Sequence, residues 1–65
     1  MKVFYDNEAD ALYLKLGDEN PEWVTEISEG ILMCVTHDGK IVGIEIADAS
    51  ERLDIKTILS YYNDS

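Results

Sequence analysis

Residues 31–47, with the sequence ILMCVTHDGKIVGIEIA, decide the fold of this chain. Two apolar runs with a period of two, at 31–36 and 41–47, flank a polar stretch that contains Asp38-Gly39. Asp-Gly in this setting is typical of a β-hairpin closed by a two-residue type I′ turn. Such a turn pairs Ile31 with Ile46, Met33 with Ile44 and Val35 with Val42 on one apolar face.

The opposite face of this hairpin is mixed in character. The same register pairs Leu32 with Glu45, Cys34 with Gly43 and Thr36 with Ile41. Because a small domain with two layers leaves such a face in water, we expect another molecule to cover Leu32, Cys34 and Ile41 in part. A second subunit is the simplest candidate. A covered Glu45 needs a partner from a neighbouring strand or from that subunit.

Outside this hairpin the apolar period is two in the first half of the chain and helical at the end. Short β-rich runs lie at 2–5, 11–16 and 23–27, and polar turns separate them. After Ala47, the residues Ile55, Ile58, Leu59 and Tyr62 have the spacing of a buried helical stripe. Asp48 and Glu51 have the spacing of a capping box at the helix start, and Ser50 is the alternative cap.

The predicted fold class is therefore α+β. We expect an antiparallel β-meander of about five strands with one C-terminal helix packed across a face. The length of 65 residues predicts a single domain over 1–65. A domain of this size usually needs disulfides or oligomerisation to stabilise it. The single cysteine excludes an internal disulfide. That leaves oligomerisation, or packing good enough to do without it, and of these we expect a homodimer.

Charge and composition exclude several classes of function. Fourteen acidic residues against five basic ones give a net charge of -9, which argues against binding nucleic acid or an anionic membrane surface. The hydrophobic share of 46% is too high for a disordered acidic tail. No apolar run approaches the ~20 residues that cross a bilayer, and no secretory signal opens the chain.

The first candidate for chemistry is the acidic loop Asp6, Glu8 and Asp10. Carboxylates at this spacing can bind a hard divalent cation weakly, although the glycine and distal Glu of a calcium loop are absent. The alternative is that Asp6 and Asp10 brace the turn through backbone hydrogen bonds and that Glu8 is solvated.

No catalytic residue and no cofactor are predicted. Cys34 and His37 have an odd spacing on a strand and its turn, so they point to opposite faces. Among the aromatic residues, Tyr61 and Tyr62 adjoin each other near the C-terminus, and we expect one of them to stay exposed for contact with a partner. Gly43 lies mid-strand, where a close approach by backbone or an aromatic ring explains a glycine.

Two motifs resemble one known family. The first is Tyr5-Asp6-x-Glu8-x-Asp10-x-Leu12-Tyr13, and the second runs from Asp38-Gly39 to Asp48-Ala49-Ser50. Together they resemble the small prokaryotic proteins called domain of unknown function 2283. This resemblance implies a compact α+β domain in the cytoplasm of a bacterium or archaeon, with no assigned activity. We associate genes of this family with a neighbouring gene for a small toxin-like protein. This association suggests an antitoxin role.

Three functions remain open. The first is a non-catalytic protein-binding module, antitoxin-like, that neutralises a basic partner by charge. The second is a self-associating structural domain with no specific ligand. The third is an enzyme or a weak divalent-metal-binding protein that uses the acidic loop.

Overall fold

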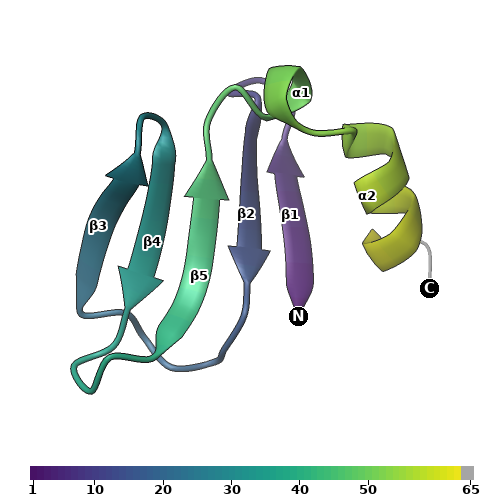
Figure 1. The fold of residues 1–65 in the computed structure, drawn as a ribbon. Coiled ribbons are helices and arrows are strands. Elements are labelled where there is room, and N and C mark those ends of the chain that lie inside the picture. Colours follow the sequence, from purple (N-terminus) through teal and green to yellow (C-terminus); the bar gives the residue numbers. More distant parts are fainter. Residues whose placement is uncertain (64–65) are drawn as a thin grey trace.

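The computed structural model describes residues 1–63 as a five-stranded antiparallel sheet followed by two short helices (Figure 1). The strands are β1 Lys2–Asp6, β2 Ala11–Lys15, β3 Trp23–Ser28, β4 Ile31–Val35 and β5 Ile41–Ile46. The helices are α1 Ala49–Arg52 and α2 Ile55–Asn63. These elements confirm the predicted α+β class and the antiparallel sheet.

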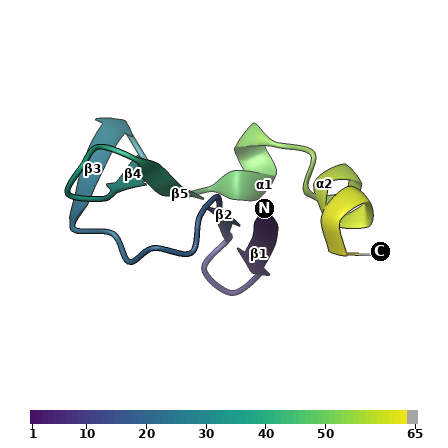
Figure 2. The same ribbon diagram turned by 90° about the horizontal axis from the view of Figure 1, so that it is seen from below.

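The strand order is β1-β2-β5-β4-β3, which is meander-like within two units. The hairpin β1–β2 and the meander β3–β4–β5 join where β2 pairs with β5. At this junction Leu12 faces Ile46 and Leu14 faces Ile44, so one face of the joint is apolar. The polar loop after β2 crosses to the far edge of the sheet, where β3 begins (Figure 2).

The β4–β5 hairpin confirms most of the predicted register, but its turn differs. Met33 faces Ile44 and Cys34 faces Gly43 as expected, whereas Val35 faces Ile41 instead of Val42. A type I′ turn needs a positive φ at both central residues, and in Asp38-Gly39 only Gly39 has one, at 90°. The prediction of a two-residue turn was therefore wrong.

Thr36 organises the longer loop that takes its place. The Gly39 N–H donates to the Thr36 carbonyl at 3.1 Å, and the Thr36 N–H donates to the Lys40 carbonyl at 2.9 Å. The Thr36 hydroxyl accepts from the Lys40 N–H at 3.0 Å and donates to the Asp38 carboxylate, which lowers the pKa of Asp38. The extra loop residue is absorbed by a bulge at Val42, which restores the register for the rest of the hairpin.

Two helices replace the single predicted helix. Leu53 has extended backbone angles, which end α1 after one turn. Asp54 then caps α2, because its carboxylate accepts from the Thr57 N–H at 3.3 Å and from the Thr57 hydroxyl at 2.9 Å. The predicted capping box is absent, since Asp48 has a left-handed φ of 52° and makes no side-chain cap.

The main hydrophobic cluster lies at one end of the sheet, while Cys34 and Val42 are buried on β4 and β5. Val3, Leu12 and Ala49 are buried in this cluster, and apolar side chains of α2 pack against them. Both helices lie at the β1–β2 end, with α2 beside β1 at the sheet edge, and neither covers the β3–β4 hairpin (Figure 2). The sheet therefore carries a second layer over only part of one face.

Candidate functional site

Asp10 joins the β1–β2 turn to α1. It has a φ of 52°, and its carboxylate accepts from the Tyr5 hydroxyl at 2.7 Å and from the Ser50 hydroxyl at 2.7 Å. The Ser50 N–H donates to the same carboxylate at 3.0 Å, and the Ala49 N–H donates to the Asp10 carbonyl at 2.9 Å. Asp10 thus accepts the hydrogen bonds at the start of α1 for which either Asp48 or Ser50 was the predicted cap.

This hydrogen-bond network shifts two pKa values in opposite directions. The Tyr5 hydroxyl, followed by Ser50, stabilises the ionised carboxylate and lowers the pKa of Asp10. The same hydrogen bond to Asp10 raises the pKa of Tyr5. Asp10 is therefore an anionic hydrogen-bond acceptor that contacts Tyr5 on β1 and Ser50 on α1.

Asp6 stabilises the same loop through backbone hydrogen bonds, which was the predicted alternative to cation binding. Its carboxylate accepts from the Glu8 N–H at 3.0 Å and from the Ala9 N–H at 3.3 Å, while Glu8 is exposed. Among the described residues, no group of three or more His, Cys, Asp or Glu side chains is placed to hold a metal ion.

Weak divalent-cation binding at Asp6, Glu8 and Asp10 stays a prediction. If this loop binds a divalent cation, the melting temperature of the chain will rise with millimolar calcium or magnesium and fall with EDTA. A melting temperature that ignores both additions would remove it.

The mixed face is the sheet face opposite the helices, and one row of it crosses all five strands. From β1 to β3 this row contains Phe4, Tyr13, Glu45, Leu32 and Glu26. Phe4 and Tyr13 form a tilted pair with ring centroids 6.4 Å apart, and Phe4 is 52% exposed. Glu45 and Glu26 are exposed on either side of the half-buried Leu32. In this row the apolar Leu32 therefore lies between two carboxylates.

Tyr13 covers the neighbouring row of this face from within the same chain. A Cβ on Gly43 would lie 2.8 Å from the Tyr13 ring carbon Cζ, which confirms that an aromatic ring closely approaches this glycine. Burial of Tyr13, followed by its contact with Cys34, raises the pKa of the Tyr13 hydroxyl. Cys34 is buried without any second subunit, so the side chain predicted to need cover already has it.

Ile41 lies on the other face of the sheet from Leu32 and Cys34. The bulge at Val42 sets Ile41 opposite Val35, and directly opposed residues share a face. The predicted place of Ile41 on the mixed face was wrong, because a bulge cannot be read from alternation alone.

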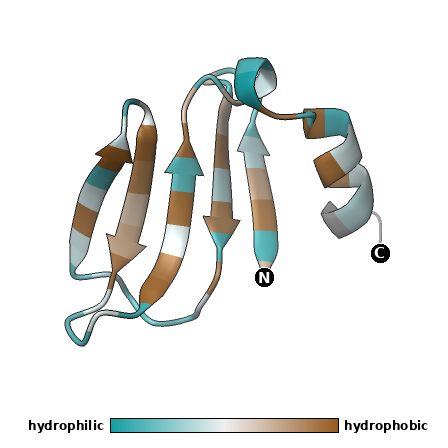
Figure 3. Ribbon diagram, in the orientation of Figure 1, coloured by the Kyte–Doolittle hydropathy of each residue, from teal (hydrophilic) through white to brown (hydrophobic). Residues whose placement is uncertain are grey.

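We call the uncovered half of the helix-bearing face the open face. It comprises Trp23, Thr25, Met33, Val35, Ile41 and Ile44. Trp23 is 51% exposed and Ile41 is 48% exposed. Figure 3 shows apolar residues along β4 and β5, the strands that form the centre of this region. Trp23 closes one rim by stacking on His37 at a centroid distance of 5.6 Å, and His37 Nδ1 lies 3.1 Å from Glu22 Oε2.

The C-terminal tyrosines are placed only in part. Tyr61 is 75% exposed on α2, which agrees with the expectation that one of the pair faces outward. The side chain of Tyr62 lies outside the part of the chain that the structure describes.

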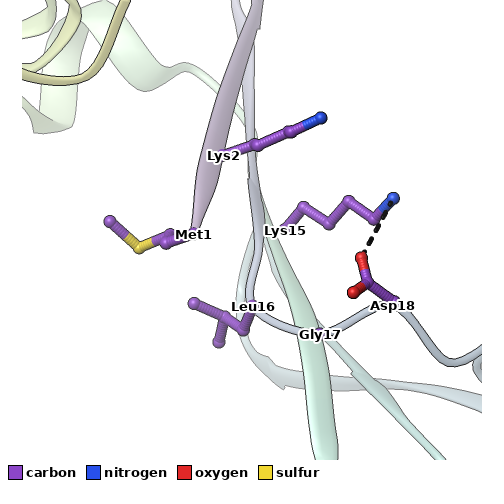
Figure 4. A pocket seen from close by; sticks show the side chains of 6 residues that line it. All are labelled: Met1, Lys2, Lys15, Leu16, Gly17 and Asp18. Atoms are coloured by element: carbon purple, nitrogen blue, oxygen red, sulfur yellow. Dashed lines mark ion pairs between the residues drawn. The ribbon is translucent and has the colours of Figure 1, made fainter. Parts of the chain in front are cut away.

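A shallow pocket lies where β1 begins and β2 ends. Figure 4 shows Lys2 and Lys15 extending to one side of it and Met1 and Leu16 to the other. Lys15 Nζ lies 3.9 Å from the Asp18 carboxylate. This pocket brings two cations to a corner of the mixed face and gathers no acid–base or nucleophile pair.

Comparison with known families identifies the chain. A family model described as Protein of unknown function (DUF2283) matches residues 2–50. The chain belongs to this family. No curated protein and no solved structure matched the chain. The DUF2283 match covers all five strands and the first residues of α1, whereas α2 follows it.

The two DUF2283-like motifs of the sequence meet in space. Tyr5 and Asp10 come from the first motif and Ser50 from the second, and hydrogen bonds join all three. The motifs therefore coincide with a structural tie between the β1–β2 turn and α1.

The sequence did not point to Phe4 and Glu26 as members of the row that contains Glu45. Their alternation along 2–5 and 23–27 was visible, but their place in the row depends on long-range strand pairing. Finally, no helix within residues 1–63 is long and apolar enough to cross a membrane.

Proposed function

We propose that this DUF2283 protein is a non-catalytic protein-binding module that holds a basic partner protein on its mixed face. The observation that carries the proposal is the placement of Glu45 and Glu26 on either side of Leu32, on a sheet face that neither described helix covers. The partner's Lys or Arg side chains would pair with these carboxylates while an apolar side chain contacts Leu32.

The net charge of the chain supports a basic partner. A charge of -9 steers a cationic protein toward this domain and repels nucleic acid from it. An acidic surface of this kind can also occupy a site on the partner that otherwise binds phosphate. These properties fit an antitoxin-like role, in which the domain neutralises a basic toxin made beside it, in the cytoplasm of a prokaryote.

The test of this proposal combines genetics with a charge-matched pair of variants. A basic reading frame beside the gene is expressed alone and together with this chain, and relief of toxicity is scored. We expect the wild-type chain to protect cells from the neighbouring protein and to form a complex with it at low salt. We expect the double variant E26Q/E45Q to lose both the protection and the complex. The double variant E8Q/E51Q removes the same charge away from this row, so we expect it to keep protecting.

Two results would contradict the proposal. One is a neighbouring protein that is harmless or that this chain does not bind at low salt. The other is equal protection by E26Q/E45Q and the wild type, which would show that the mixed face takes no part.

A second candidate function, a self-associating domain, is favoured by a different observation. The open face is apolar and lacks a second layer, and self-association would supply that layer. This candidate is compatible with partner binding, because the two surfaces lie on opposite sides of the sheet.

A further inference from the structure

We infer that the open face is the contact of a homodimer, in which the open faces of two copies of this chain pack against each other about a two-fold axis. The inference concerns the opposite side of the sheet from the proposed partner site. Either proposal can therefore fail while the other stands.

The first argument is the amount of surface that the chain exposes. Its accessible surface is 4739 Å², whereas a compact chain of the same mass exposes about 4,200 Å² by the usual scaling. The excess of about 500 Å² is a large part of the ~800 Å² that each partner buries in a standard interface. The excess fits a half-covered sheet in a flat molecule, whose shortest overall extent is 16 Å.

The second argument is charge, and it selects the occupant. Two copies that each carry -9 repel, so a surface that adds no further carboxylates favours a close contact between them. The six residues of the open face include none, although Glu22 lies at its rim beside His37. The mixed face carries Glu26 and Glu45 in its central row and Lys2 and Lys15 at one corner. A basic partner gains attraction at the row that contains Glu26 and Glu45 and gains none from the six residues of the open face. A second copy has the opposite preference.

The third argument is shape. Two-fold symmetry brings the same patch of both copies together, so the patch must suit itself. A sheet face with apolar side chains in rows packs on a second such face at about 10 Å, as in β-sandwiches. On the open face Met33 opposes Ile44 and Val35 opposes Ile41, and these pairs give apolar rows that a second copy can cover. Trp23 lies at the β3 end of one row and would lose much of its exposure.

Sedimentation equilibrium of the full chain, over a range of protein and salt concentrations, measures this association. We expect a monomer–dimer equilibrium that tightens as salt rises, because screening weakens the repulsion between copies while apolar burial persists. Trp23 is the only tryptophan, so its emission reports on the same contact. We expect the emission to shift to shorter wavelength as the dimer forms.

A matched pair of variants locates the contact. Ile41→Glu places a carboxylate in the open face, and we expect it to weaken the dimer at least about tenfold, since an unpaired charge would be buried. Val24→Glu adds the same charge on β3, where the register sets Val24 opposite Cys34 on the mixed face, and we expect it to leave the dimer intact. Both side chains are about half exposed, and circular dichroism with thermal melting checks that both variants fold.

Three results would overturn the inference. One is a wild-type chain that stays monomeric at every salt and protein concentration. Another is a dimer that Val24→Glu breaks and Ile41→Glu does not, which would place the contact on the mixed face or the β3 edge. The third is a monomer whose Trp23 emission shifts only when a basic partner is added, which would give the open face to that partner.

Discussion

At the scale of single residues, Asp10 does the most to connect distant parts of the chain. Its left-handed backbone turns the chain after β1, and its carboxylate holds Tyr5 and Ser50, which come from opposite ends of the DUF2283 region. Asp tolerates a positive φ better than most residues, and both oxygens of the Asp10 carboxylate accept hydrogen bonds. The acidic loop therefore has a structural account that needs no ligand.

We expect Asp10→Asn to lower the melting temperature at neutral pH, because the amide replaces an acceptor oxygen with a donor. The lowered pKa of Asp10 stabilises the fold above the ordinary value of 3.8, and this contribution is lost as the pH falls through the folded-state pKa. The difference between wild type and variant should thus shrink in acid. Thermal melting across pH measures it, with Glu8→Gln as the control that removes the same charge from the same loop.

Gly43 is required by the ring of Tyr13. An alanine Cβ at this position would lie 2.8 Å from Cζ of the ring, so Gly43→Ala must displace Tyr13 from Cys34. We expect a loss of about 1–3 kcal/mol in the free energy of unfolding, as for other overpacked sites. In a Tyr13→Ala background the same substitution should cost nothing or stabilise the strand by up to about 1 kcal/mol. Urea denaturation of the four proteins gives the coupling, and equal costs in both backgrounds would contradict the contact.

At the scale of elements, alternation and turn chemistry predicted most of the sheet. The apolar positions from Ile31 to Ile46 fixed the β4–β5 pairing, and the helical stripe located α2. Three features were not predicted from the sequence. They are the bulge at Val42, the pairing of β2 with β5 and the break at Leu53. The pairing of β2 with β5 joins segments far apart in sequence, and Leu53 packs against the distant core. The bulge depends on how the loop at 36–40 closes, which the alternation of apolar residues does not show.

The turn of this hairpin gives a test at the element scale. Gly39 has a φ of 90°, and a Cβ built there meets nothing within 4 Å, so only backbone strain opposes a side chain. We expect Gly39→Ala to destabilise the fold by about 1–2 kcal/mol. Gly39→Asn should cost less, because Asn adopts left-handed angles more readily. Equal losses in urea denaturation would show that strain is not the cause.

At the scale of the whole molecule, the chain separates its two kinds of surface. The mixed face carries Glu26 and Glu45 around an apolar centre and two lysines at one corner, while none of the six residues of the open face is charged. The sequence indicated the first surface through Leu32, Cys34 and Glu45, which do share one face. It did not indicate Trp23 and Ile41 as one surface, because that grouping needs both the bulge and the β3 register. Composition predicted the net charge but not which face would be free of it.

This separation predicts how the stability of the chain responds to salt and concentration. If two copies share the open face, unfolding requires their dissociation, so the melting temperature should rise with protein concentration. Added salt should steepen that rise, because it screens the repulsion between two chains of charge -9. In Ile41→Glu the concentration dependence should vanish, whereas E26Q/E45Q should keep it and melt at higher temperature at low salt. Calorimetry at several concentrations and two salt levels measures both effects. A melting temperature independent of concentration in the wild type would mean that the open face is uncovered or belongs to a different molecule.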